Sequence, residues 1–365
     1  MRRHPLLSGA LAVLVVVAGV VAAGSFSVPA TAVTVDGASI SRAGVDSDLA
    51  TIEQNPAFGC YLDASVAVRS SNATGLPPIG GSGRVGTYNT GFVDFWLSQL
   101  VNNLLIEDLA SRQHLALDAT ALSAGHDDLV NSITATLEQA AAATGRAVCA
   151  QSGQAIVSTL PSGFLSDLVR SQAAGDLVLA HAAGYGLETG QLARYFNAHQ
   201  SQFETICLSA IQTSTQATAT QVRSQIEAGE SFATAASANS IDTASAANGG
   251  ALGCFSANEG AYATVAGDVN GLAVGALSQP VSNNGSYLLL EVTSHQPAAF
   301  DAVVTAVRQA VLGAGATRAA SELAAITKTA RVAIDPRYGR WSPSSGVGIV
   351  PPRRPAVADL LTPAT

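Results

Sequence analysis

The stretch that decides the fold reads SIDTASAANGGALGCF and covers residues 240–255. It holds one acid, Asp242, then the paired glycines Gly249 and Gly250, and an apolar end with Leu252 and Phe255. Paired glycines are typical of a tight backbone turn, and the apolar residues after them are typical of a strand. Taken alone, the stretch predicts a turn into a strand. The segments around it decide whether it also forms the edge of a binding pocket.

The neighbouring segments predict a compact α+β unit over residues 203–296. A β-prone run, ETICLSAIQT, comes before a helical run that ends at Gly229 and a second short helix. After the glycine pair come a short strand in LSQPV and an apolar strand in SYLLLEVTS. Strands and helices mixed at this spacing pack as a sheet with helices against it.

The flanking segments predict a mostly helical body. Apolar residues recur at helical spacing from Phe92 to Leu115, and similar runs cover residues 127–144, 164–183 and 189–200. Helical periodicity returns after Pro297, in residues 300–312 and 320–330. We therefore expect a helical domain over 33–202, the α+β unit inserted over 203–296, and a C-terminal helix and short strand over 297–341 that pack back on the helical domain. Residues 342–365 form a Pro-rich tail.

The N-terminus predicts export. A basic flank, MRRHP, precedes an apolar stretch over residues 6–23, and Ala30-Thr31-Ala32 supplies a small-residue cleavage site. This order is that of a secretory signal peptide over residues 1–32, cleaved after Ala32. The apolar stretch approaches the roughly 20 residues that a helix needs to span a bilayer. The alternative is therefore an uncleaved N-terminal anchor. Such an anchor would be the one expected contact of the chain with a membrane. Either interpretation places the rest of the chain outside the cytoplasm, secreted or in the cell envelope.

Four cysteines, an even number, predict disulfides in such an oxidising compartment. Their sequence allows three pairings and does not choose between them. Their distribution over the predicted domains favours Cys60 with Cys149 and Cys207 with Cys254.

Charge and motif content exclude several classes of function. The formal net charge of −8 argues against a nucleic-acid-binding protein, which would present a basic face. Residues 81–86 match GxGxxG, but they follow two prolines in a predicted loop, and a dinucleotide site needs a strand before the motif and a helix after it. The cysteines and histidines show no metal-ligand spacing, and we expect no cofactor.

An ordered series of motifs over residues 204–294 resembles the parvulin-type peptidyl-prolyl isomerases. It is carried by Ala219, Ile226, Gly229, Phe232, Ala236, Asp242, Ser245, Ala246, Gly249, Gly250, Leu252, Gly253, Phe255, Leu272, Gly275, Ser278, Pro280, Val281 and the strand 288–292. A helical domain split around such a unit is similar to the SurA and PrsA class of extracytoplasmic foldases. The resemblance implies a four-stranded antiparallel sheet with helices. It also implies that the partners are unfolded or newly translocated polypeptides, which would bind through their X–Pro segments.

The resemblance also implies the chemistry and the site. The reaction is rotation about the X–Pro bond, which has a barrier of about 20 kcal/mol and needs no nucleophile, metal or cofactor. The carried-over proline pocket comprises Leu252, Phe255, Ala261, Val265 and Leu288, and Asp242 takes the acidic loop position.

The two histidines typical of the family are absent. One histidine is expected near Ser209 and the other at or beside Leu288. His295 lies too far along the last strand to replace the second histidine without a register change. Ser209 is therefore the candidate polar substitute beside Asp242, although an Asp in a loop commonly hydrogen-bonds its own backbone. Two functions stay open: a slow isomerase within a foldase, and an inactive parvulin-fold holdase or scaffold that binds extended apolar segments.

Overall fold

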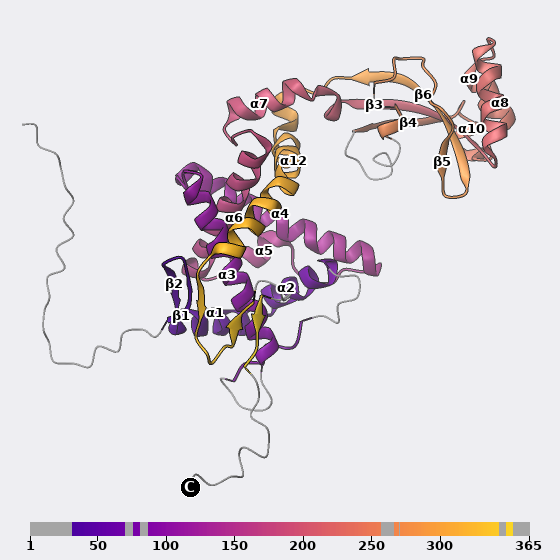
Figure 1. The fold of residues 1–365 in the computed structure, drawn as a ribbon. Coiled ribbons are helices and arrows are strands. Elements are labelled where there is room, and N and C mark those ends of the chain that lie inside the picture. The colour runs from indigo at the N-terminus through magenta and orange to yellow at the C-terminus, as the bar shows by residue number, and fades with distance from the viewer. Residues whose placement is uncertain are drawn as a thin grey trace, which may run out of the picture.

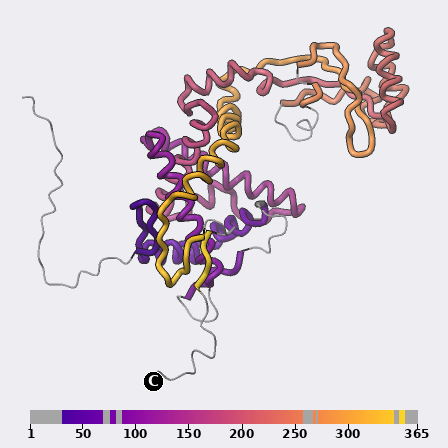
Figure 2. Tube along the Cα trace, in the orientation of Figure 1, coloured from indigo at the N-terminus to yellow at the C-terminus, as the bar shows by residue number. Residues whose placement is uncertain are grey.

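The computed structural model describes residues 31–69, 76–80, 87–256, 266–269, 271–342 and 348–352. A helical body lies at one end of the molecule and a sheet-containing unit at the other, with α7 (Thr189–Ala198) and α12 (Phe300–Thr329) leading from one to the other (Figures 1 and 2). The predicted residues Ala261 and Val265, most of the signal sequence (1–30) and the GxGxxG motif (81–86) lie outside the described residues.

In the helical body, a strand from near the start of the described residues pairs with the strand that follows α12. β1 (Thr31–Val35) pairs antiparallel with both β2 (Ala38–Ser41) and β7 (Val332–Ile334). Ala32 is 1% exposed, and its carbonyl accepts a hydrogen bond of 2.9 Å from the Asp335 amide. The strand thus includes Thr31 and Ala32, which precede the predicted cleavage point; cleavage after Ala32 stays a prediction.

In the part of the chain that the structure describes, seven α-helices before the inserted sheet form most of the helical body. They are α1 (Arg42–Gln54), α2 (Pro56–Arg69), α3 (Thr90–Arg112), α4 (Ala119–Thr144), α5 (Gly153–Ser158), α6 (Ser162–Ala183) and α7. Side-chain oxygens of Ser41, Asn89, Asp118 and Ser152 accept hydrogen bonds from backbone amides at the starts of α1, α3, α4 and α5, which satisfies donors that a helix start leaves free. The Asp118 cap explains why α4 begins well before the predicted run at 127.

The C-terminal helix closes this body. The sequence predicts helical runs on both sides of residues 313–319, and the structure joins them into the single helix α12. A Cβ at Gly315 would lie 1.8 Å from the Leu179 carbonyl oxygen of α6. The glycine therefore permits a close approach of two helices and does not end the helix. Beyond α12, the short strands β8 (Arg340–Trp341) and β9 (Ile349–Val350) pair with each other.

The inserted unit is built on a sheet with strand order β4-β3-β6-β5, all antiparallel. The strands are β3 (Thr205–Thr213), β4 (Ala251–Ser256), β5 (Val281–Asn283) and β6 (Ser286–Gln296), with helices α8 (Gln216–Glu227), α9 (Phe232–Asn239), α10 (Thr243–Ala246) and α11 (Ala266–Val269). The predicted α+β class and four-stranded antiparallel sheet are confirmed. The domain boundaries at 202/203 and 296/297 stay predictions.

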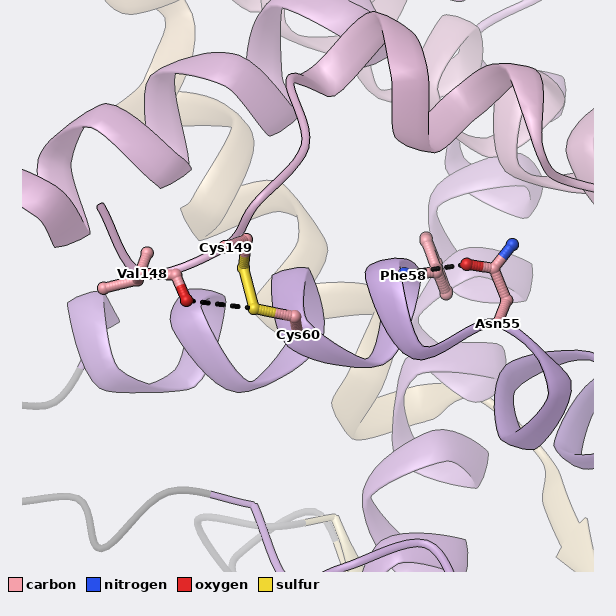
Figure 3. The surroundings of a disulfide bond; sticks show 5 residues. All are labelled: Asn55, Phe58, Cys60, Val148 and Cys149. Carbon is pink, nitrogen blue, oxygen red and sulfur yellow. Dashed lines mark hydrogen bonds between the residues drawn. A yellow bond between two sulfur atoms is a disulfide. The ribbon is translucent and has the colours of Figure 1, made fainter.

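Both favoured cysteine pairings are confirmed. Cys60 of α2 is bonded to Cys149, which follows α4, and Phe58 at the start of α2 donates its amide to the Asn55 side chain (Figure 3). Cys207 of β3 is bonded to Cys254 of β4, its direct partner in the strand register. Each disulfide thus crosslinks one part of the molecule: the first the helical body, the second the sheet.

Among the described residues, no helix combines the length and the apolar character needed to cross a membrane.

Removing the first disulfide should destabilise the helical body selectively. It closes a loop of 89 residues, and losing such a crosslink typically costs about 2–5 kcal/mol. Both tryptophans of the chain, Trp96 and Trp341, pack in the main core of the helical body. In denaturant unfolding followed by tryptophan fluorescence, Cys60→Ala/Cys149→Ala should lower the midpoint and Cys207→Ala/Cys254→Ala should leave it unchanged. Equal shifts for both double variants would contradict this assignment.

Gly250→Ala should loosen the sheet more than Gly253→Ala. Both glycines have positive φ, +85° and +100°, where an L-residue costs roughly 1–2 kcal/mol. At Gly250 a Cβ would also lie 2.7 Å from the Ala210 carbonyl oxygen, whereas at Gly253 it meets nothing within 4 Å. We expect a further cost of about 1–3 kcal/mol from overpacking at Gly250 alone. Hydrogen exchange of the β3 and β6 amides, measured by mass spectrometry, should show faster exchange for Gly250→Ala; equal exchange in the two variants would refute the clash.

Candidate functional site

The inserted sheet has two differently covered faces. On one face, Ile211 and Leu289 pack against α8 and α9 through Val222 and Phe232. On the other, apolar side chains of β3 and β6 pack with Phe255 of β4, Val269 of α11, Val281 of β5 and Leu272; those from β3 and β6 are Ile206, Leu208, Ala210, Leu288, Leu290 and Val292. We call this second surface the Phe255 face.

Three of the predicted pocket residues can be placed on this framework. Phe255 lies opposite Ile206, and Leu288 belongs to the same cluster from β6; both side chains are half-buried. Leu252 is 40% exposed and is the extra residue of a β-bulge, because the register passes from Gly253 opposite Leu208 to Ala251 opposite Ser209. Bulges near sites redirect side chains. Phe255 and Leu288 thus belong to one cluster but lie toward opposite ends of β3, opposite Ile206 and Gln212, and Leu252 is exposed at the bulge.

Asp242 is held by its own neighbours. Its side chain caps α10 by accepting a hydrogen bond from the Ala244 amide (3.2 Å) and one from the Ser245 hydroxyl (2.5 Å). The Ser245 hydroxyl is the main cause that holds the pKa of Asp242 below its usual value. The structure therefore shows Asp242 as a helix cap, which is the structural alternative that the sequence left open. The hydrogen bonds of the cap stabilise the charged form of the Asp242 carboxylate.

Ser209 lies on the wrong face for the predicted role. Side chains alternate along a strand, and Leu208 and Ala210 both belong to the Phe255 face, so Ser209 points with Ile211 toward the helices. The sheet itself separates Ser209 from Phe255 and Leu288. The residue that does face them is the adjacent Ala210, which has no polar side-chain atom.

His295 lies far from Leu288 along the sheet, as predicted, because His295 pairs with Ile206 and Leu288 with Gln212 at the other end of β3. A register shift leaves Thr293 unpaired, so that Cys207 pairs with Ser294 while Leu208 pairs with Val292. The shift brings His295 opposite Ile206, in the same row as Phe255. Its Nε2 lies 2.7 Å from the Leu272 carbonyl oxygen and its Nδ1 3.2 Å from Glu204. Both ring nitrogens have protein partners, so His295 fastens the segment at Leu272 to the sheet.

The chemistry of the Phe255 face follows from this inventory. Most of this cluster is core, and its partly buried members are Phe255, Leu272, Val281 and Leu288. The half-buried ring of Phe255 is of the kind that can pack against a proline ring or another apolar side chain. Ala210 and Leu288 occupy the region where the resemblance implies histidines, and neither can donate or accept a hydrogen bond through its side chain. In the part of the chain that is described, no group of three or more His, Cys, Asp or Glu side chains is arranged to hold a metal ion.

Comparison with known proteins identifies this unit. Residues 206–294 match the family model described as Rotamase: PPIC-type PPIASE domain. No curated protein matches the chain. Among solved structures, the parvulin domain of PpiD from E. coli is 28% identical, with 26% of this chain and 92% of that chain covered and a TM-score of 0.24.

Longer solved structures are similar over more of the chain. PrsA from Bacillus cereus is 14% identical, with 68% of this chain and 87% of that chain covered and a TM-score of 0.40. The foldase PrsA from Streptococcus pneumoniae is 16% identical, with 72% and 96% covered and a TM-score of 0.33. The family match, on a four-stranded sheet with its apolar face in place, identifies residues 206–294 as a PPIC-type, parvulin peptidyl-prolyl isomerase domain.

Proposed function

We propose that the protein is an extracytoplasmic foldase that binds unfolded or newly translocated polypeptides and presents their X–Pro segments to the Phe255 face. The observation that carries the proposal is the PPIC-type domain with Phe255 and Leu288 joined in one apolar cluster. Two disulfides support action in an oxidising compartment, as does the signal-like N-terminal sequence. Partners are polypeptides, not nucleic acids.

Catalysis by this domain should be slow. An isomerase must favour the twisted amide, in which resonance is lost, over the planar one. The Phe255 face offers apolar contact to the proline ring, but Ala210 and Leu288 bring no polar group to the twisted amide. These two residues favour a second function, a holdase that binds extended apolar segments without accelerating isomerisation.

An X–Pro isomerisation assay together with an aggregation assay separates the two. Phe255→Ala removes the ring from the face, whereas Thr220→Ala changes an exposed residue of α8 on the far side of the sheet. For an isomerase, the catalysed rate should exceed that of buffer, fall at least tenfold in Phe255→Ala and persist in Thr220→Ala. For a holdase, the rate should equal that of buffer while an unfolded client stays soluble. Failure in both assays would overturn the foldase proposal.

Asp242 should act through its cap and not through its charge. Asn caps helices about as well as Asp, whereas Ala costs about 1 kcal/mol. Asp242→Asn should therefore keep both thermal stability and activity in the assays above, and Asp242→Ala should lower the stability of the sheet unit. An Asp242→Asn variant that is stable but loses isomerase activity would show that the carboxylate acts on the substrate.

A further inference from the structure

One polar side chain of the inserted sheet lies on the Phe255 face without belonging to its apolar cluster. Gln212 of β3 lies two residues beyond Ala210, and side chains alternate along a strand, so both emerge on the same face. Between Ile206 and Thr213, Gln212 is the one residue of β3 that is not buried. It pairs with Leu288 of β6. An uncharged amide therefore lies beside the position where the resemblance implies the second histidine.

The backbone of Gln212 connects it to the loop that carries Asp242. Its amide donates to the Ser240 hydroxyl at 3.1 Å, and its carbonyl oxygen accepts from the Ile241 amide at 2.8 Å. Because both groups point to this loop, Gln212 and Leu288 form a non-hydrogen-bonded pair, in which the facing side chains are close together. Gln212 therefore lies between the acidic loop and the last strand, from which the resemblance draws polar groups of the site.

The side-chain amide of Gln212 is oriented by β6 and keeps an unused donor. Its Nε2 donates to the Ser286 hydroxyl at 2.7 Å, and that hydroxyl donates to the Asn283 carbonyl oxygen at 2.6 Å. A hydroxyl has one proton, so Ser286 accepts from Gln212, which identifies the nitrogen end of the amide. Among the described residues, the second N–H of Nε2 and the oxygen Oε1 have no hydrogen-bond partner.

The hairpin between β5 and β6 does not account for this amide. It turns tightly at Asn284 and Gly285, which both have positive φ, and the Ser286 hydroxyl already closes it on Asn283. Gln212 adds one contact from a third strand, and that contact uses one N–H only. The second N–H is directed by the first and is available to a ligand on the half-buried surface around Leu288 and Val281.

Such a donor suits the twisted X–Pro amide. In the planar amide, the lone pair of the prolyl nitrogen is delocalised into the carbonyl group, and in the twisted amide this resonance is lost. The nitrogen then becomes a hydrogen-bond acceptor. A donor that meets the nitrogen only in this form stabilises the transition state without stabilising the bound planar amide, so it raises kcat. No proton or group is transferred, because the reaction is a bond rotation.

We propose that Gln212 is the catalytic residue of this domain: its free Nε2–H donates to the prolyl nitrogen of a twisted X–Pro amide, while apolar side chains of the segment lie along the Phe255 face. The inference rests on the isomerase arm of the proposed function and names the group that performs it. Ser286 is a positioning residue, since its hydroxyl holds the other N–H. A single neutral hydrogen bond gives a modest acceleration, in keeping with slow catalysis.

X–Pro isomerisation by the full chain, with kcat and KM measured separately, tests this. Gln212→Met keeps the length and the apolar stem of the side chain and removes the donor. It should lower the catalysed kcat about fivefold, the usual value of one neutral hydrogen bond, and leave KM unchanged. The matched control is Gln221→Met, the same change at an exposed residue of α8 on the other side of the sheet, which should retain both constants.

Ser286→Ala separates a catalytic role of the amide from a structural one. It leaves the donor in place and frees the N–H that holds it, so kcat should fall by less than in Gln212→Met, again at constant KM. A structural role would instead lower the thermal midpoint in both variants and leave kcat per folded molecule unchanged.

A measurement on the unaltered chain decides if Gln212→Met does not fold, as judged by circular dichroism. In ¹H–¹⁵N spectra of the isotope-labelled full chain, the side-chain NH₂ resonances of Gln212 should shift on saturation with the X–Pro substrate peptide, and those of Gln221 should not. The absence of a shift at Gln212 would overturn the contact with substrate.

The kinetic outcomes also separate this inference from the proposed function. Isomerisation above the buffer rate with unchanged kcat in Gln212→Met would refute the role of Gln212 and leave the foldase proposal intact. A rate equal to that of buffer, with an unfolded client kept soluble, would refute the role of Gln212 and leave the holdase. Neither isomerisation nor protection of a client would refute both.

Discussion

The close contact of α12 with α6 at Gly315 is the constraint on which the two-part arrangement depends. The chain leaves the helical body after α7, forms the inserted sheet and returns as α12. A side chain at position 315 would collide with the Leu179 carbonyl oxygen, so the helices reach this distance only because the residue is glycine. Above the contact, Phe300 and Val307 of α12 pack with Phe196 of α7. Below it, Ala319 and Leu323 pack in a cluster with Val178 of α6. The end of α12 then feeds β7 onto β1.

The same return of the chain creates a buried cluster of charged side chains in the helical body. Arg308 reaches Asp128 and approaches Asp176 only because α12 lies along both α4 and α6. Buried ion pairs of this kind seldom stabilise a fold more than apolar packing would. Here two acids, Asp128 and Asp176, share one arginine, and burial is the main cause that raises the pKa of Asp176 to about 7. In its protonated form Asp176 can hydrogen-bond to Asp128, and Gln172 donates to its other oxygen, so the cluster is satisfied within the fold.

The sequence predicted the parts of the fold that depend on local pattern and composition. Periodicity located the helices and the main strands, and the glycine pair with Leu252 and Phe255 located β4. The favoured cysteine pairs followed from the predicted division of the chain into domains, with each pair inside one domain. What failed depends on single-residue register. Ser209 and Ala210 are neighbours on opposite faces of β3, and a position known only as near Ser209 cannot distinguish them. The bulge at Thr293 that moves His295 into the row of Phe255 has no glycine or proline to mark it. Likewise, no periodicity could show that acids from α4 and α6 meet an arginine from α12.

The side chains of the Phe255 face limit what the inserted domain can do with a proline-containing segment. Its cluster is apolar, and Ala210 and Leu288 have no polar side-chain atom. Apolar contact to the proline ring stabilises the planar and the twisted amide about equally, whereas catalysis requires that the twisted amide be favoured. We therefore expect binding of such a segment to exceed catalysis of its isomerisation in this domain.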